Sequence, residues 1–145
     1  MGLPTTEAYA VLQGVKIWYA EYGQGVPLVM LHPGGVDSSA LQPTFEAMSQ
    51  HFRVFLPERR GHGHTPDAPG AYTYDLMAED TIHFIEQLVG EPVRLFGMSD
   101  GGIVALLVAY KRPDLVHRLV CVASVYHYEG WLPGAIGPVS QPPEF

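Results

Sequence analysis

The sequence predicts an α/β fold, with a mostly parallel, twisted sheet of about six strands and flanking helices. Short apolar runs of strand length alternate with segments whose apolar residues recur at helical spacing. Some of these runs are nearly continuous, as in parallel strands that are buried on both faces. The chain has 145 residues, of which 47% are hydrophobic and 16% charged, so it can form one domain with a substantial core.

The first half of the chain predicts four strands and one helix. Residues 8–12 and 16–22 are separated by a Gln-Gly turn and are expected to form a hairpin. The apolar run at 26–31 predicts a buried strand. A helix is expected over 38–52, because its apolar residues are spaced by four and three. Another short strand follows at 53–56.

The second half predicts two helices and two strands. A helix over 73–89 has Thr73 as its N-terminal cap and Gly90 at its end. An apolar strand then leads into a helix over 101–110, and the last strand is expected from Leu119 to Val125. Because the carboxyl ends of parallel strands meet at one rim of a sheet, the glycine-containing loops after three strands are expected to lie close together.

The segment Gly97-Met98-Ser99-Asp100-Gly101 connects a strand to a helix, which places Ser99 on a tight turn. Glycine on either side of Ser99 avoids clashes that a Cβ would create. The helix that follows presents free N–H groups and a partial positive charge near the serine oxygen. This pattern predicts a nucleophilic serine, although a glycine-rich turn of this kind also binds phosphate.

With two further motifs, residues 15–129 resemble the α/β-hydrolase superfamily. His32-Pro33-Gly34-Gly35 (the 32–35 loop) is similar to the family's oxyanion loop, and Arg59 to Thr65 is similar to its R-G-x-G-x-S/T loop. The resemblance implies a truncated core at 1–129 that lacks the last two strands and most of the lid. Residues 130–145 are then a Pro/Gly-rich tail or the start of a lid segment.

The resemblance also implies roles for individual residues. Ser99 is expected to attack a carbonyl, with the oxyanion bound by backbone N–H groups of Asp100 and of Gly34 or Gly35, since Pro33 has no N–H. The Asp100 side chain is expected to be solvated or to cap the helix. The residues expected to shape the site are His32, Arg60, Gly61, His62, Gly63, Gly97 and Gly101.

The catalytic base is the open question, because a serine hydroxyl stays protonated without one. His127 lies just beyond the last predicted strand, on the same rim as Ser99, and Glu129 is its nearest acid. His62 or His64 is an alternative, and so is the absence of any base within the chain. His117 is expected to lie on the surface at the opposite end of the sheet.

The formal charge of −7 and the lack of a Lys/Arg run argue against nucleic acid and anionic membranes as partners. No N-terminal signal segment is visible, which favours a cytoplasmic location. No cofactor or metal is expected, although His62 and His64 leave a zinc site as an alternative. The expected substrate is a small carboxylic ester or a related carbonyl compound. The alternative function is a non-catalytic module that binds a ligand or dimerises.

The strand from Leu119 to Val125 is expected to leave an apolar, unpaired edge. We therefore expect either a homodimer that pairs through this strand or a missing C-terminal half that covers it. Such a dimer would bring His127 and Glu129 of one chain toward Ser99 of the other.

Overall fold

The computed structural model describes residues 2–134. A single sheet contains β1 (Thr6–Leu12), β2 (Val15–Tyr22), β3 (Pro27–Leu31), β4 (Arg53–Pro57), β5 (Val93–Met98) and β6 (Val116–Val122) in the order β1-β2-β4-β3-β5-β6. β2 is antiparallel to β1 and β4, and the other neighbouring strands are parallel. The predicted fold class is therefore confirmed, and β3, β4 and β5 end at the same rim.

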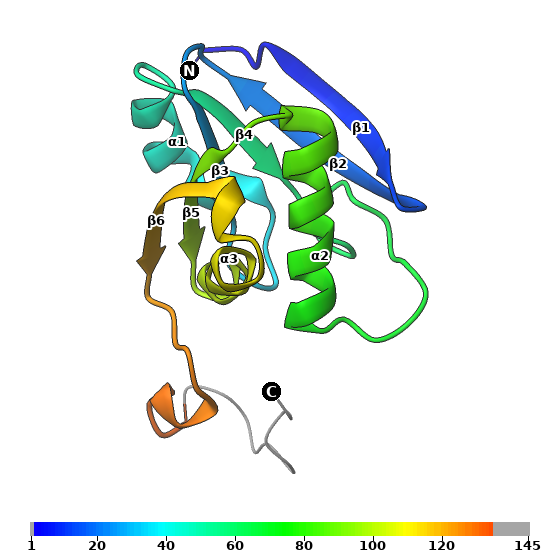
Figure 1. Cartoon of the computed structure of the whole chain (residues 1–145), viewed down its shortest axis with the longest axis vertical. Coiled ribbons are helices and arrows are strands. Elements are labelled where there is room, and N and C mark those ends of the chain that lie inside the picture. Colours follow the sequence, from blue (N-terminus) through cyan, green and yellow to red (C-terminus); the bar gives the residue numbers. More distant parts are fainter. Residues whose placement is uncertain (1, 135–145) are drawn as a thin grey trace.

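Helices cover both faces of the sheet. α2 (Tyr74–Phe84) and α3 (Asp100–Lys111) lie together on one face, as Figure 1 shows. α1 (Gln42–Met48) covers the other face, where Leu41 and Phe45 pack on apolar residues of β2, β3 and β4. β3 is buried along its whole length between these layers. This burial explains its uninterrupted apolar sequence.

The predicted helix over 73–89 is confirmed as a helical segment of two parts. The Thr73 hydroxyl accepts a hydrogen bond from the N–H of Leu76 at 3.1 Å, as expected of an N-cap. The segment continues from α2 as a π-helical turn (Ile85–Val89). Gly90 ends it in the left-handed conformation, φ +75°.

The prediction of one helix over 38–52 was wrong. A 3₁₀ turn (Ser38–Leu41) comes first, then α1 with Pro43 in its first turn, and the helix ends at Met48. Proline has no N–H to donate to the preceding turn, so the regular α-helix begins only there.

The last strand begins and ends three residues before its predicted bounds. β6 follows directly on a 3₁₀ turn (Pro113–Leu115) and ends at Val122. The polar pair His117 and Arg118 lies within it, because both side chains are exposed on an edge strand. The predicted strand therefore began too late, at Leu119, because these polar residues were not counted in it.

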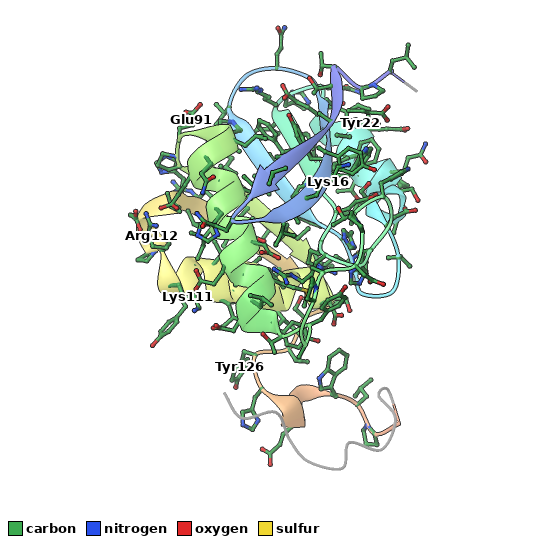
Figure 2. The ribbon with its side chains drawn as sticks, turned by 90° about the vertical axis from the view of Figure 1, so that its right-hand side faces the viewer. Lys16, Tyr22, Glu91, Lys111, Arg112 and Tyr126 are labelled. Atoms are coloured by element: carbon green, nitrogen blue, oxygen red, sulfur yellow. The ribbon has the colours of Figure 1, made fainter. Side chains whose placement is uncertain are left out.

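The free edge of β6 (the β6 edge) is unpaired, as predicted, and it is apolar toward its carboxyl end. Val120 and Val122 are 52% and 38% exposed, and no strand among residues 2–134 pairs with this edge. Beyond β6 the chain leads away from the sheet to a short turn (Tyr128–Gly130), and Tyr126 on this segment is 90% exposed (Figures 1 and 2). Most of the predicted 130–145 tail lies outside the described residues.

Candidate functional site

Ser99 lies on the turn between β5 and α3, as the glycine pattern predicts. Its backbone has φ +53° and ψ −121°, a conformation that residues other than glycine adopt only under strain. A Cβ on Gly97 would lie 2.2 Å from the carbonyl oxygen of Gly101. One on Gly101 would lie 2.2 Å from the carbonyl oxygen of Leu31. Both glycines are therefore required by backbone packing.

Backbone hydrogen bonds hold the Ser99 turn in place. The Ser99 N–H donates to the carbonyl of Val122 on β6 at 2.9 Å. The Ser99 carbonyl accepts from the N–H of Gly102 at 2.9 Å and from the Ser124 hydroxyl at 3.0 Å. α3 begins at Asp100, so the N–H of Asp100 belongs to the first turn, which has no partner within the helix.

The 32–35 loop is fixed from below by His32, which is fully buried. Its Nε2 accepts a hydrogen bond from the N–H of Arg59 at 3.2 Å, so the ring proton lies on Nδ1, which donates to the Pro33 carbonyl at 2.7 Å. Burial lowers the pKa of His32 to about 3, and the charge of Arg59 acts in the same direction. His32 is thus a neutral support for the loop.

Arg59 is a site residue that the sequence-based reasoning missed. Its side chain is only 3% exposed, and its guanidinium donates to the carbonyls of His32 at 2.6 Å and Pro33 at 3.1 Å. The sequence predicted a role for Arg60 instead. The sequence did contain a signal, because Arg59 and Arg60 follow a buried strand in which successive side chains point to opposite sides. Two adjacent arginines there are expected to have different surroundings.

Arg60 and the glycines after it shape the neighbouring loop. Arg60 forms a buried, bidentate ion pair with Asp80 of α2, at 2.7 and 2.8 Å. Gly61 and Gly63 both have positive φ, and a Cβ on Gly63 would lie 2.1 Å from a carboxylate oxygen of Glu58. The contacts of these residues are with side chains of the neighbouring elements.

The Asp100 side chain is half-buried in the first turn of α3 and has a partner that the sequence did not indicate. Its carboxylate accepts a hydrogen bond from the Tyr74 hydroxyl at 2.8 Å. Burial and this bond raise the pKa of Tyr74 to about 12. A Cβ on Gly34 would lie 2.0 Å from the Asp100 carboxylate, so Gly34 packs directly on the residue after Ser99. Gly35 adjoins open space with φ +71°.

Each histidine considered as a base has a contact with a group other than Ser99. His127 Nδ1 lies 3.7 Å from a carboxylate oxygen of Glu129, but both side chains are exposed, on the segment that leads away from the sheet. The His64 ring stacks on Trp18, and its Nδ1 lies 3.0 Å from a carboxylate oxygen of Glu58. His62 Nδ1 lies 3.0 Å from the Arg60 carbonyl. His117 is exposed within β6, not before it.

Two hollows adjoin the rim. One, of about 330 Å³, lies between the 32–35 loop and the loop at 61–63, with Asp37 and His62 on its walls. The other, of about 610 Å³, is lined by residues 124–127, 129 and 130. Within residues 2–134 there is no group of three His, Cys, Asp or Glu side chains able to hold a metal ion. None of the described helices is long and apolar enough to span a bilayer.

The buried His32 predicts a loss of stability in mild acid. The unfolded chain takes up a proton on this residue near pH 6.5, whereas the folded chain does so only near pH 3. Between these values the free energy of unfolding is expected to fall by up to about 1.4 kcal/mol per pH unit as the pH is lowered. Urea unfolding at pH 7 and pH 5 measures this slope. His32→Gln should flatten it, and His51→Gln on the surface should not. Equal slopes in wild type and His32→Gln would contradict the prediction.

The sequence of this chain is similar to those of known hydrolases. The sequence model described as alpha/beta hydrolase fold matches residues 27–143. (E)-2-((N-methylformamido)methylene)succinate hydrolase of Acinetobacter baylyi is 37% identical over 109 residues, which are 74% of this chain and 41% of that protein. A pimeloyl-acyl-carrier-protein methyl ester esterase of Aliivibrio fischeri is 31% identical over 117 residues, covering 79% and 43%.

A solved structure shows the same likeness. Epoxide hydrolase CorEH without ligand superposes with a TM-score of 0.81 and 28% sequence identity over 92% of this chain and 47% of that one. The chain spans less than half the length of the relatives it matches.

Proposed function

Because the chain belongs to the alpha/beta hydrolase fold family, we propose that it is a serine hydrolase that cleaves small carboxylic esters through Ser99. The observation that carries the proposal is the strained Ser99 turn, which lies beside the Gly34 backbone and Asp100. One relative's name describes an ester-cleaving enzyme. The likeness to an epoxide hydrolase shows that the fold alone leaves the reaction open.

In the proposed reaction Ser99 Oγ attacks the ester carbonyl while a base takes up the hydroxyl proton. The oxygen of the tetrahedral intermediate accepts hydrogen bonds from the N–H groups of Asp100 and Gly34. Collapse of the intermediate breaks the bond to the alcohol, which leaves with a proton, and water then hydrolyses the acyl-serine. The hollow of about 330 Å³ beside Gly35 is proposed to hold part of the substrate.

The base is proposed to come from a second polypeptide segment at the β6 edge. Two-fold pairing through β6 would be antiparallel and would put His127 of one copy at the rim opposite to Ser99 of the other, so a base from a second copy is proposed to need a dimer of another geometry. The other source is a C-terminal half like that of the longer relatives, which extend well beyond the matched region. A C-terminal half that adds strands to the sheet would also cover exposed Val120 and Val122.

The proposal predicts that a fluorophosphonate probe labels Ser99. Serine oxygen attacks phosphorus, fluoride leaves, and the hydroxyl proton passes to the base, so the rate reports both the nucleophile and its activation. Peptide mass spectrometry locates the adduct. A labelling rate per chain that rises with protein concentration identifies a second copy as the source of the base. Absence of an adduct on Ser99 would overturn the proposed function.

The rival function is a non-catalytic binding module. The observation in its favour is that His32, His62 and His64, the histidines of the loops at the rim, are hydrogen-bonded to groups other than Ser99. In that case the hollow beside Gly35 would bind a ligand without chemistry, and the Ser99 hydroxyl would remain unlabelled.

A further inference from the structure

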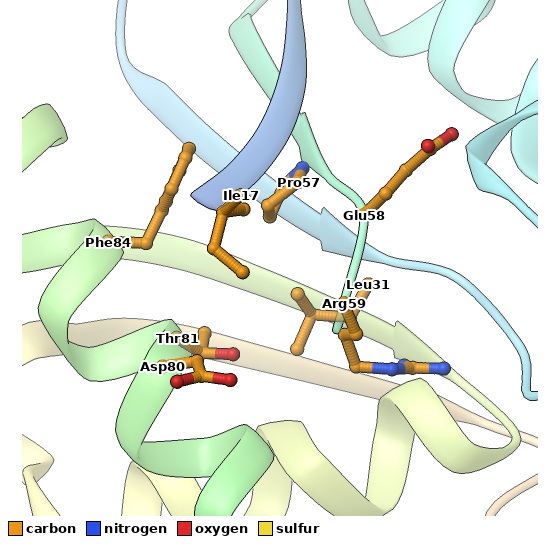
Figure 3. Close-up of a pocket in the computed structure, with 8 residues that line it drawn as sticks. All are labelled: Ile17, Leu31, Pro57, Glu58, Arg59, Asp80, Thr81 and Phe84. Carbon is orange, nitrogen blue, oxygen red and sulfur yellow. The ribbon is translucent and has the colours of Figure 1, made fainter. Parts of the chain in front are cut away.

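Arg59 is a buried cation whose hydrogen bonds lead to backbone rather than to an acid. Its side chain is 3% exposed, and within residues 2–134 no carboxylate forms an ion pair with it. Asp80 is paired with Arg60, and the charge of Asp100 favours the charged form of Arg59 without forming an ion pair with it. Figure 3 shows the Arg59 side chain extending away from Asp80, while the carboxylate of Glu58 points to the other side of the chain.

Burial of the Arg59 charge is unfavourable by itself, so other contacts must offset its cost. Burial lowers the pKa of Arg59 to about 10, which still leaves the guanidinium charged at neutral pH. Its Nε is the one buried side-chain nitrogen or oxygen of residues 2–134 without a hydrogen-bond partner. The adjoining cavity, about 10 Å³, is too small for a substrate. What Arg59 does gain is two strong bonds to consecutive carbonyls of the 32–35 loop.

The direction of these carbonyls fixes the direction of the next N–H group. The Pro33–Gly34 peptide is trans, so its C=O and N–H point in opposite directions. The Pro33 carbonyl accepts from both Arg59 and His32 beneath the loop, so the Gly34 N–H must point away from them. Gly34 itself packs against Asp100, the neighbour of Ser99.

We propose that Arg59 is a positioning residue, which holds the His32 and Pro33 carbonyls so that the Gly34 N–H stays directed toward the oxyanion formed at Ser99. The catalytic part of this inference rests on the proposed function. The structural part, that Arg59 sets the orientation of the Gly34 amide, does not. A lysine cannot replace Arg59, because one ammonium group lacks the planar fork that binds two carbonyls at once.

The test compares Arg59→Lys with Arg53→Lys. Arg53 begins β4 at the end away from the rim and pairs with Glu21, whereas Arg59 contacts the 32–35 loop. Arg59→Lys is expected to slow fluorophosphonate labelling of Ser99 at least about tenfold, a smaller loss than the roughly 10²–10³-fold that follows removal of an oxyanion donor. Arg53→Lys is expected to leave the rate per folded molecule unchanged. Thermal unfolding supplies the folded fraction.

A second measurement is independent of activity. In ¹⁵N-labelled protein, Arg59→Lys should shift the Gly34 amide resonance and accelerate its hydrogen exchange, while the amide of distant Gly90 stays unchanged. An unchanged Gly34 amide overturns the inference, and so does unchanged labelling of Ser99 in Arg59→Lys. If the wild type is not labelled at all, the proposed function fails, and the Gly34 amide still decides whether Arg59 positions the loop.

Discussion

Replacing Ser99 with alanine is expected to lower the rate of hydrolysis of a short-chain nitrophenyl ester about 10³-fold or more. The alanine variant keeps the backbone turn and both N–H groups near the oxyanion but has no oxygen to form the acyl-enzyme. Release of nitrophenol at neutral pH measures the rate. Ser49→Ala, which changes a serine remote from the turn, is the matched control and should keep the wild-type rate. Equal rates in wild type and Ser99→Ala would leave only the binding function.

Substitutions at Ser99 are also expected to differ in stability, with glycine favoured over alanine. At φ +53° and ψ −121° any residue with a Cβ is strained by about 1–3 kcal/mol, whereas glycine is not. Glycine loses more entropy on folding, about 0.5–1 kcal/mol. Ser99→Gly is therefore expected to be inactive but about 1 kcal/mol more stable than Ser99→Ala in urea unfolding. Equal stability of the two variants would show that the turn is not strained.

The second large effect is expected at Gly101, where alanine should destabilise the protein by about 3 kcal/mol or more. A glycine-to-alanine change inside a helix normally stabilises by roughly 0.5–1 kcal/mol, so the sign itself is diagnostic. Here the added Cβ would lie 2.2 Å from the Leu31 carbonyl and 2.6 Å from that of His32. Both are backbone atoms that cannot rotate away.

Gly90→Ala is the matched control for Gly101→Ala. Nothing lies within 4 Å of a Cβ at Gly90, so this variant meets only the cost of a left-handed backbone, about 1–2 kcal/mol. Denaturant unfolding of both variants gives the comparison. If Gly101→Ala were as stable as wild type, α3 would not approach β3 as closely as the structure shows.

Much of the fold could be predicted because apolar periodicity reports burial directly. The uninterrupted apolar run of β3 and the spacing in α2 both led to the right element. The errors arose where a local feature competed with periodicity. Pro43 delayed the start of α1, and the polar residues of β6 were tolerated because the strand lies at an edge.

The candidate site was predictable only in part. Ser99, Gly97 and Gly101 could be named because a serine between two glycines after a strand restricts the backbone to few conformations. The partner of Asp100 could not be found this way, since Tyr74 is 26 residues distant and starts a different helix. That His127 is the catalytic base stays a prediction. Its place in the sequence just after a strand that ends at the rim favoured it, and the described contacts do not test it.

The alternation of strands and helices, and the serine turn after the fifth strand, could be predicted from local patterns, because they depend on residues close together in the chain. The sequence also favoured Arg60 for the loop after the fourth strand. The folded chain was needed to see that Arg59 lies buried beneath the 32–35 loop while Arg60 pairs with Asp80. Two adjacent arginines have the same chemistry, so the carbonyl or carboxylate that each one contacts depends on how distant segments pack around the end of β4.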